Sequence, residues 1–88
     1  MIIPEEARLK YIERRKKDIE SLREALSSNS FDEFKRVGHQ LKGNAASFGY
    51  SDLEKIAIQL EAAGMKQDRR EALQQVDLFE QWYTKVLS

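Results

Sequence analysis

The chain has 88 residues, which is enough for one small domain and too few for two. Its 15 basic and 15 acidic residues cancel, which argues against a generic nucleic-acid binder and gives no reason to expect attraction to a membrane surface. Cysteine is absent and there is one histidine, so disulfides and thiolate metal sites are excluded and no metal site is expected.

No apolar run approaches the roughly 20 residues that a membrane-spanning helix needs. The opening residues, MIIPEEARLK, lack the long apolar region of a signal peptide. We therefore expect a cytoplasmic protein that does not associate with membranes.

The first predicted helix runs from about residue 4 to residue 26. Pro4 suits a first helical turn, and the acidic residues that follow it favour the positive end of the helix dipole. Apolar residues recur at helical spacing along one face. They are Ile12, Ile19, Leu22 and Leu26.

The second helix is predicted over residues 31–48. Ser30 and Glu33 have the spacing of a capping box, in which each side chain bonds the backbone amide of the other residue. Gly49 is a natural stop, because glycine readily adopts the left-handed conformation that ends helices. The apolar stripe consists of Phe34, Val37, Leu41, Ala45 and Phe48.

The third helix is predicted over residues 52–63. Ser51 and Glu54 form a second possible capping box, and Gly64 is expected to end the helix. The apolar positions are Leu53, Ile56, Ala57, Leu60 and Ala63.

The fourth helix is predicted over residues 69–87, after a third possible capping box formed by Asp68 and Glu71. Its apolar face contains Ala72, Val76, Phe79, Tyr83 and Val86. Four amphipathic helices with short connections predict an all-α protein, an antiparallel up-down four-helix bundle that forms a single domain over residues 1–88.

A basic run, RRKK at residues 14–17, raises the possibility of an anion-binding patch. Four consecutive residues point around more than one turn of a helix, and nearby acidic residues offset their charge. We interpret the run as solvated surface and expect no nucleic-acid partner.

His39 is predicted to face solvent. At about 100° per residue, the other apolar residues of the second helix fall within about 40° of Leu41, whereas His39 falls about 160° away. Lys35 and Lys42 flank the ring on the same helix, and Gly43 and Ala46 follow it at one-turn intervals.

This arrangement suits phosphoryl transfer through an imidazole nitrogen. Neutral imidazole is nucleophilic near neutral pH, since its reference pKa is about 6.5. Nearby ammonium groups stabilise the negative charge on a phosphoryl group. A mid-helix glycine costs about 1 kcal/mol relative to alanine, so Gly43 suggests that something must approach closely. Since no second catalytic group is visible, we expect a carrier rather than an enzyme.

The segment from His39 to Gly49 resembles the H-x-L-K-G-x-x-x-x-x-G signature of histidine-containing phosphotransfer (HPt) domains. The segment LEKIAIQLE, Leu53 to Glu61, also resembles the next helix of that family. The resemblance implies a phosphorelay role in two-component signalling, in which the histidine exchanges a phosphoryl group with a receiver-domain aspartate or accepts it from a kinase.

The resemblance assigns His39 as the phosphorylated residue, at Nε2, with Lys42 stabilising the phosphoryl group and Gly43 giving the receiver room. Gly49 would end the helix and allow close packing. Expected docking positions for a partner are Lys35, Gln40 and Ala46. The implied partners are a response-regulator receiver domain and a hybrid sensor or chemotaxis-type kinase. Any Mg²⁺ would belong to the receiver, this chain would carry no cofactor, and we expect a monomer.

Two alternatives remain open. The segment NAASFGY, residues 44–50, particularly resembles the phospho-accepting domain of chemotaxis-type kinases, although no kinase region is attached. The proline that follows the histidine in the dimerisation domains of ordinary sensor kinases is missing. The second alternative is an adaptor that binds a receiver or kinase without carrying phosphate.

Gly38 lies at the edge of the apolar stripe of the second helix. Close packing against another helix would explain a glycine at this position.

Overall fold

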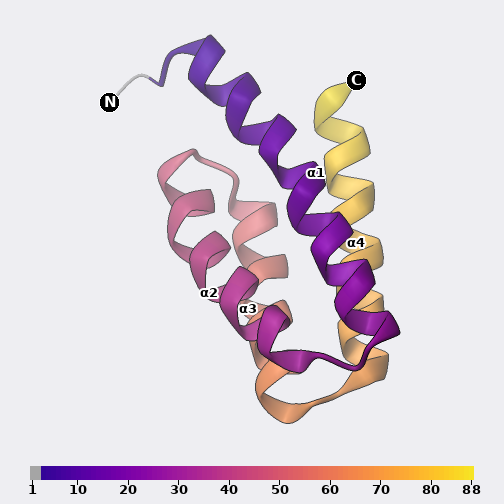
Figure 1. Cartoon of the computed structure of the whole chain (residues 1–88). Coiled ribbons are helices and arrows are strands. Elements are labelled where there is room, and N and C mark those ends of the chain that lie inside the picture. The colour runs from indigo at the N-terminus through magenta and orange to yellow at the C-terminus, as the bar shows by residue number, and fades with distance from the viewer. Residues whose placement is uncertain (1–2) are drawn as a thin grey trace.

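The computed structural model describes residues 3–88, which form four helices joined by short turns (Figure 1). They are α1 (Glu5–Ser27), α2 (Phe31–Ser47), α3 (Ser51–Lys66) and α4 (Arg69–Leu87). Each helix contacts the next one in the chain, and α4 returns to contact α1. The predicted up-down four-helix bundle is therefore confirmed. None of the helices between residues 3 and 88 is both long and apolar enough to span a membrane.

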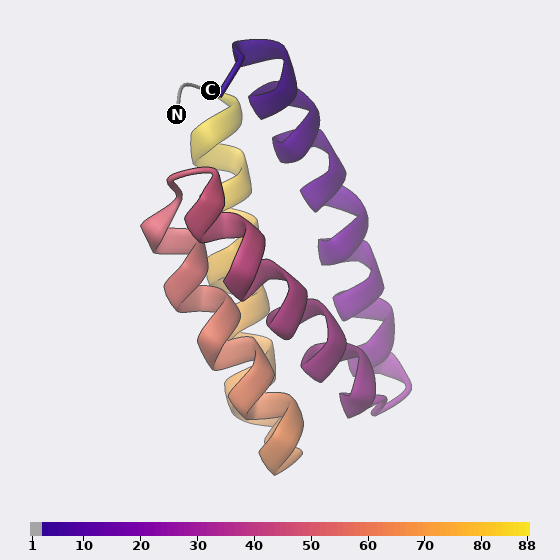
Figure 2. The same ribbon diagram turned by 90° about the vertical axis from the view of Figure 1, so that its left-hand side faces the viewer.

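The four helices are not evenly spaced. The contact between α2 and α3 is the most extensive one in the bundle, and the contact between α1 and α2 is much smaller. Figure 2 shows α1 and α2 close together at their connecting turn and diverging toward the other end of the bundle. The start of α1 also extends beyond the turn that joins α2 to α3 (Figure 1).

The core is formed by the apolar stripes of all four helices, as their helical periodicity predicts. Its fully buried large side chains are Leu22, Phe34, Val37, Leu41, Leu53, Leu60, Val76 and Phe79. Aromatic rings fill the wider end, where α1 and α2 diverge. Tyr11 stacks on Phe48 with ring centroids 4.1 Å apart, and Tyr50 packs against the edge of Trp82 at 5.3 Å. Stacked and edge-to-face pairs of this kind add to the stabilisation from burial.

The predicted end of the third helix is wrong. The helix continues through Gly64 to Lys66, and Gln67 takes the left-handed conformation with φ 54°. The Gln67 amide donates to the Gly64 carbonyl and the Asp68 amide donates to the Ala63 carbonyl, which is the Schellman pattern. Gly64 is buried instead, where a Cβ would lie 2.8 Å from the Lys35 backbone nitrogen. It is a packing glycine, and it does not end the helix.

Two of the three predicted capping boxes do not form. Ser30 makes no side-chain capping bond, and the Glu33 carboxylate instead accepts from Arg36 at 2.8 and 2.7 Å. Ser51 is already the first residue of α3, so it cannot cap that helix. The cap of α4 is confirmed in part, since the Asp68 side chain accepts from the Glu71 amide at 3.1 Å.

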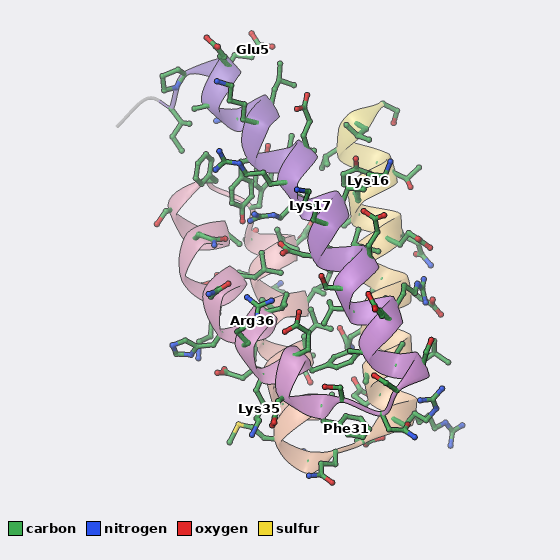
Figure 3. All side chains as sticks on the ribbon, viewed as in Figure 1. Glu5, Lys16, Lys17, Phe31, Lys35 and Arg36 are labelled. Carbon is green, nitrogen blue, oxygen red and sulfur yellow. The ribbon has the colours of Figure 1, made fainter. Side chains whose placement is uncertain are left out.

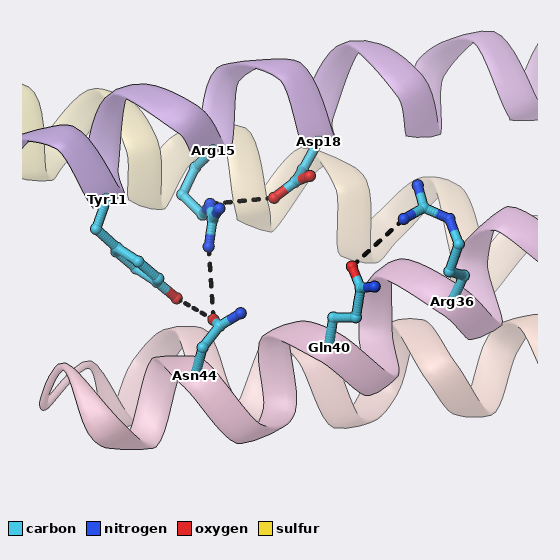
Figure 4. Close-up of polar contacts among 6 residues, drawn as sticks. All are labelled: Tyr11, Arg15, Asp18, Arg36, Gln40 and Asn44. Carbon is cyan, nitrogen blue, oxygen red and sulfur yellow. Dashed lines mark hydrogen bonds and ion pairs between the residues drawn. The ribbon is translucent and has the colours of Figure 1, made fainter.

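Polar side chains line the contact between α1 and α2 (Figure 4). Tyr11 donates a hydrogen bond to the Asn44 side-chain oxygen, and Arg15 Nε lies 3.0 Å from Asp18 Oδ2 without the alignment of a hydrogen bond. Burial raises the pKa of the Asp18 carboxyl, against the attraction of Arg15. The α1–α2 contact is small, and polar side chains line it. Helix α1 is therefore held to the bundle mainly by its buried core residues and by its contact with α4.

The side chains of the basic run at residues 14–17 point in different directions from α1. Lys16 and Lys17 project from α1 into solvent (Figure 3), whereas Arg15 turns inward and lies over the Tyr11 ring at 4.2 Å. The run therefore does not present four cations on one face.

Candidate functional site

The orientation of α2 decides where His39 points. Leu41, Val37 and Phe34 turn into the core, and His39 on the opposite side of the helix has a side chain that is 72% exposed. The outward orientation predicted from the helical wheel is confirmed. Two hollows lie along the α1–α2 contact, one with Ser21 and Arg36 in its lining and one with Ala7 and Phe48, and neither includes His39. A partner can therefore reach the ring without entering a cavity.

Glu61 on α3 contacts the ring and was missed by the sequence analysis. Its Oε2 lies 2.9 Å from His39 Nδ1, and its Oε1 accepts a hydrogen bond from Lys42 Nζ at 2.8 Å. One carboxylate therefore holds both the imidazole and the ammonium group. Charges one turn away from His39 on its own helix do not reveal a partner that lies on the neighbouring helix. The available signal was that Glu61 follows Leu60 of the apolar stripe, at the border of a packed face.

The contact selects the tautomer of the neutral ring. The hydrogen bond from Lys42, with a smaller contribution from His39, holds the pKa of Glu61 below its ordinary value, so the carboxyl is ionised at neutral pH. An ionised carboxylate only accepts hydrogen bonds. Nδ1 of His39 must therefore carry the proton, which leaves the lone pair of the neutral ring on Nε2.

Close packing of α2 against α3 brings Glu61 within reach. A Cβ on Gly38 would lie 2.5 Å from the Glu61 backbone nitrogen, 2.8 Å from the Ala57 carbonyl oxygen and 2.9 Å from the Glu61 Cα. Only glycine permits this approach, which confirms the packing expectation for Gly38. The residue before the histidine therefore sets the distance between the two helices at the level of the site.

Gly43 and Gly49, which follow His39 in the chain, have environments that differ from that of Gly38. A Cβ on Gly43 would have no heavy atom within 4 Å, so the surface beside His39 is open at this point. Gly49 has φ +82° and, with Tyr50, closes a Schellman motif onto the carbonyls of Ala46 and Ala45. Gly49 therefore ends α2, as the sequence predicts.

The three expected docking residues are not all on one side of α2. Lys35 projects from the outer side of α2 (Figure 3), where its Nζ pairs with Asp32 at 3.1 Å, and Ala46 is exposed. Gln40 lies toward α1, where its side-chain oxygen accepts from Arg36 at 3.3 Å (Figure 4). Gln40 is thus separated from the face that carries Glu61.

Two exposed apolar side chains lie beside Glu61 on α3, at helical spacings of three and four residues. Ile58 is 43% exposed and Met65 is 70% exposed. Together with Lys35 and Ala46 they give the surface around His39 a mixed apolar and basic character. Among residues 3–88, no group of three or more His, Asp or Glu side chains is arranged to hold a metal ion.

Comparison with known proteins identifies the family of the chain. A scan against protein-family models matches the Hpt domain over residues 6–88. Searches of the curated proteins and of the solved structures gave no significant match. Members of this family are helical bundles that transfer phosphoryl groups through a histidine in phosphorelay signalling, where they interact with receiver domains and kinases. The chain belongs to the Hpt domain family.

Proposed function

We propose that this domain is a phosphorelay carrier that accepts a phosphoryl group on Nε2 of His39 and exchanges it with a receiver-domain aspartate. The observation that carries the proposal is the exposed ring whose Nδ1 lies 2.9 Å from Glu61 Oε2. This contact leaves the nucleophilic lone pair on the nitrogen that faces away from Glu61.

The neighbouring residues take supporting roles. Lys42 places its ammonium group 2.8 Å from Glu61 and one helical turn from the ring, so it can turn to the oxygens of a bound phosphoryl group. The open surface at Gly43 leaves room for the receiver to bring its aspartate in line with Nε2. This chain supplies no cofactor in the proposal, and Mg²⁺ binds to the receiver.

The docking surface surrounds the ring on both helices. Lys35 and Ala46 on α2 and Ile58 and Met65 on α3 are exposed near the site. Apolar side chains in the centre with charged groups at the rim are typical of transient protein interfaces. Gln40 is at the margin of this surface, because its side chain lies toward α1.

The test is phosphorylation of the purified protein by receiver domains charged with acetyl phosphate, and by histidine kinases supplied with ATP. We expect a label that is labile in acid and stable in base, as phosphohistidine is. His39→Gln should abolish the label, and Gln74→Glu, a change at an exposed position of α4 away from the site, should retain it. No label on the intact protein across a fair panel of receivers and kinases would falsify the proposal.

The same assay separates the two alternatives. Label from a chemotaxis-type kinase alone, without exchange with receivers that accept phosphate from relay carriers, favours a phospho-accepting kinase domain, which the NAASFGY segment resembles. Receiver binding that persists in His39→Ala without any label indicates an adaptor.

A further inference from the structure

One of the two hollows along the α1–α2 contact lies at the wider end of the bundle, where the two helices diverge (Figure 2). This wide-end hollow has a volume of about 320 Å³, which is within the range of about 300–1,000 Å³ that is usual for small-molecule sites. Helix α1 contributes Lys10, Arg14 and Arg15 to its lining, and α2 contributes Asn44 and Phe48. The hollow is therefore built from both helices and is separate from the site at His39.

The wide-end hollow has a positive charge. Three cationic side chains line it, and none of the described residues in its lining is acidic. Arg15 is paired with Asp18 at 3.0 Å, and Lys10 is held loosely by Glu6 at 3.6 Å. Arg14 is exposed and forms no ion pair within residues 3–88. The charges of Lys10 and Arg14, which lie one helical turn apart, are thus available to an anion.

The α2 side of the hollow supplies a polar donor and an apolar wall. The side-chain oxygen of Asn44 accepts hydrogen bonds from Tyr11 and, at 3.5 Å, from Arg15 (Figure 4). Its NH₂ group has no partner within residues 3–88 and remains a donor. Phe48 stacks on Tyr11 and is only partly buried, and Ala7 continues the apolar surface across to α1.

We propose that the wide-end hollow binds a small organic phosphate, namely a phosphate monoester with a flat apolar body. A phosphate monoester carries a charge of about −1.5 to −2 near neutral pH and has three terminal oxygens. Lys10, Arg14 and the Asn44 amide are three donors that match those oxygens. The apolar body covers Phe48 and Ala7, which a free inorganic anion would leave exposed to water.

Such a ligand would connect α1 to α2 where their own contact is small. Binding to the folded protein alone stabilises it by mass action, so the ligand raises the Tm. The inference goes beyond the proposed function and does not depend on it, because His39 takes no part in binding.

The test titrates the ¹⁵N-labelled protein with phenyl phosphate. ¹H–¹⁵N correlation spectra follow the side-chain NH₂ of Asn44 and the Nε–H of Arg15, which is buried. Inorganic phosphate, which lacks the ring, and benzoate, which lacks the third oxygen, are titrated for comparison. AMP in place of phenyl phosphate distinguishes a nucleotide from a smaller aryl phosphate, and binding of either one supports the inference.

Two variants locate the binding. Arg14→Gln removes a cation of the hollow at an exposed position, so the fold is retained. Lys16→Gln is the matched control, because it removes the same charge from the same helix at a side chain that projects into solvent (Figure 3).

We expect phenyl phosphate to shift the Asn44 and Arg15 signals, and to raise the Tm by about 5–10 °C at ten times its dissociation constant. Arg14→Gln should weaken binding by about fivefold or more, whereas Lys16→Gln should change it by less than about twofold. Inorganic phosphate should bind about tenfold more weakly, and benzoate about fivefold more weakly.

Two results would overturn the inference as a whole. One is unchanged Asn44 and Arg15 signals with both phenyl phosphate and AMP at concentrations up to about 10 mM. The other is an equal loss of affinity in Arg14→Gln and Lys16→Gln, which would indicate general attraction to a basic surface. Equal binding of inorganic phosphate would refute the role of the apolar wall, and equal binding of benzoate would refute the assignment of a phosphate.

Discussion

Replacing Gly38 by alanine tests whether the α2–α3 approach builds the site. The added Cβ would lie 2.5 Å from the Glu61 nitrogen, 2.8 Å from the Ala57 carbonyl oxygen and 2.9 Å from the Glu61 Cα. All three are backbone atoms of α3, so no side chain can rotate away to relieve the overlap. The two helices must separate, and Glu61 moves away from His39 with its helix.

Two effects of opposite sign determine the change in stability. Alanine is favoured over glycine inside a helix by about 1 kcal/mol. Overpacking typically costs about 1–3 kcal/mol, and contacts with rigid backbone belong in the upper part of that range. The expected net loss is roughly 1–2 kcal/mol, which lowers the Tm of a domain of this size by about 4–16 °C.

Gly43→Ala is the matched control, because it makes the same substitution in the same helix where a Cβ has no neighbour within 4 Å. It should gain about 1 kcal/mol and raise the Tm by about 4–8 °C. Thermal and urea unfolding followed by circular dichroism measure both variants, and labelling measures His39 phosphorylation in Gly38→Ala, which we expect to be slower. Equal shifts in the two variants, or stabilisation by Gly38→Ala, would refute the packing argument.

Three further predictions concern the surface, the ion pairs and a helix end. Gly43→Leu should leave the helix content unchanged yet slow transfer from a charged receiver by about tenfold or more, which is about 1.4 kcal/mol of lost transition-state stabilisation; a normal rate would contradict the access argument. A hydrogen bond from Lys42 lowers the pKa of Glu61, and one from Arg36 lowers the pKa of Glu33. Each pair therefore stabilises the folded protein above about pH 4.3, and this contribution is lost as the pH falls through the lowered pKa of the carboxyl in the folded state. Glu61→Gln and Glu33→Gln should each cost about 0.5 kcal/mol at pH 7 and approach the wild-type Tm near pH 3, and a difference independent of pH would show that the charges are not responsible. The raised pKa of Asp18, caused mainly by burial, acts in the opposite direction; Glu61→Gln leaves its causes in place, whereas Glu33→Gln removes a nearby negative charge that adds to the rise. Gln67→Gly should raise the Tm, because it relieves a left-handed residue that costs about 1 kcal/mol, whereas Gln67→Ala should not; equal effects would contradict this explanation.

The helices and the direction of His39 could be predicted because both depend on periodicity within one segment. The same pattern that buries Leu41 turns His39 outward, and no knowledge of the neighbouring helix is needed. The starts and ends of helices were less predictable. Arg36 takes the Glu33 carboxylate from the expected cap, and Gly64 is used for packing so that Gln67 ends α3.

Glu61 could not be placed because its role depends on how α2 crosses α3. The crossing is set by contacts of Gly38 and Gly64 with backbone atoms of the partner helix. A glycine in a sequence indicates that something comes close, but it does not say which residue that is. Two helices must be packed before a carboxylate from one can be assigned to an imidazole of the other.

The site residues His39, Lys42 and Glu61 all lie within the hairpin of α2 and α3, and neither α1 nor α4 contributes a side chain to their contacts. Substitutions on the outer surfaces of α1 and α4 therefore leave the contacts among His39, Lys42 and Glu61 in place. Their main structural constraint at the surface is the pairing of Arg23 on α1 with Asp77 and Glu80 on α4. In searches for distant relatives, sequence similarity within the α2–α3 hairpin, from Phe31 to Lys66, should therefore count for more than similarity within α1 and α4.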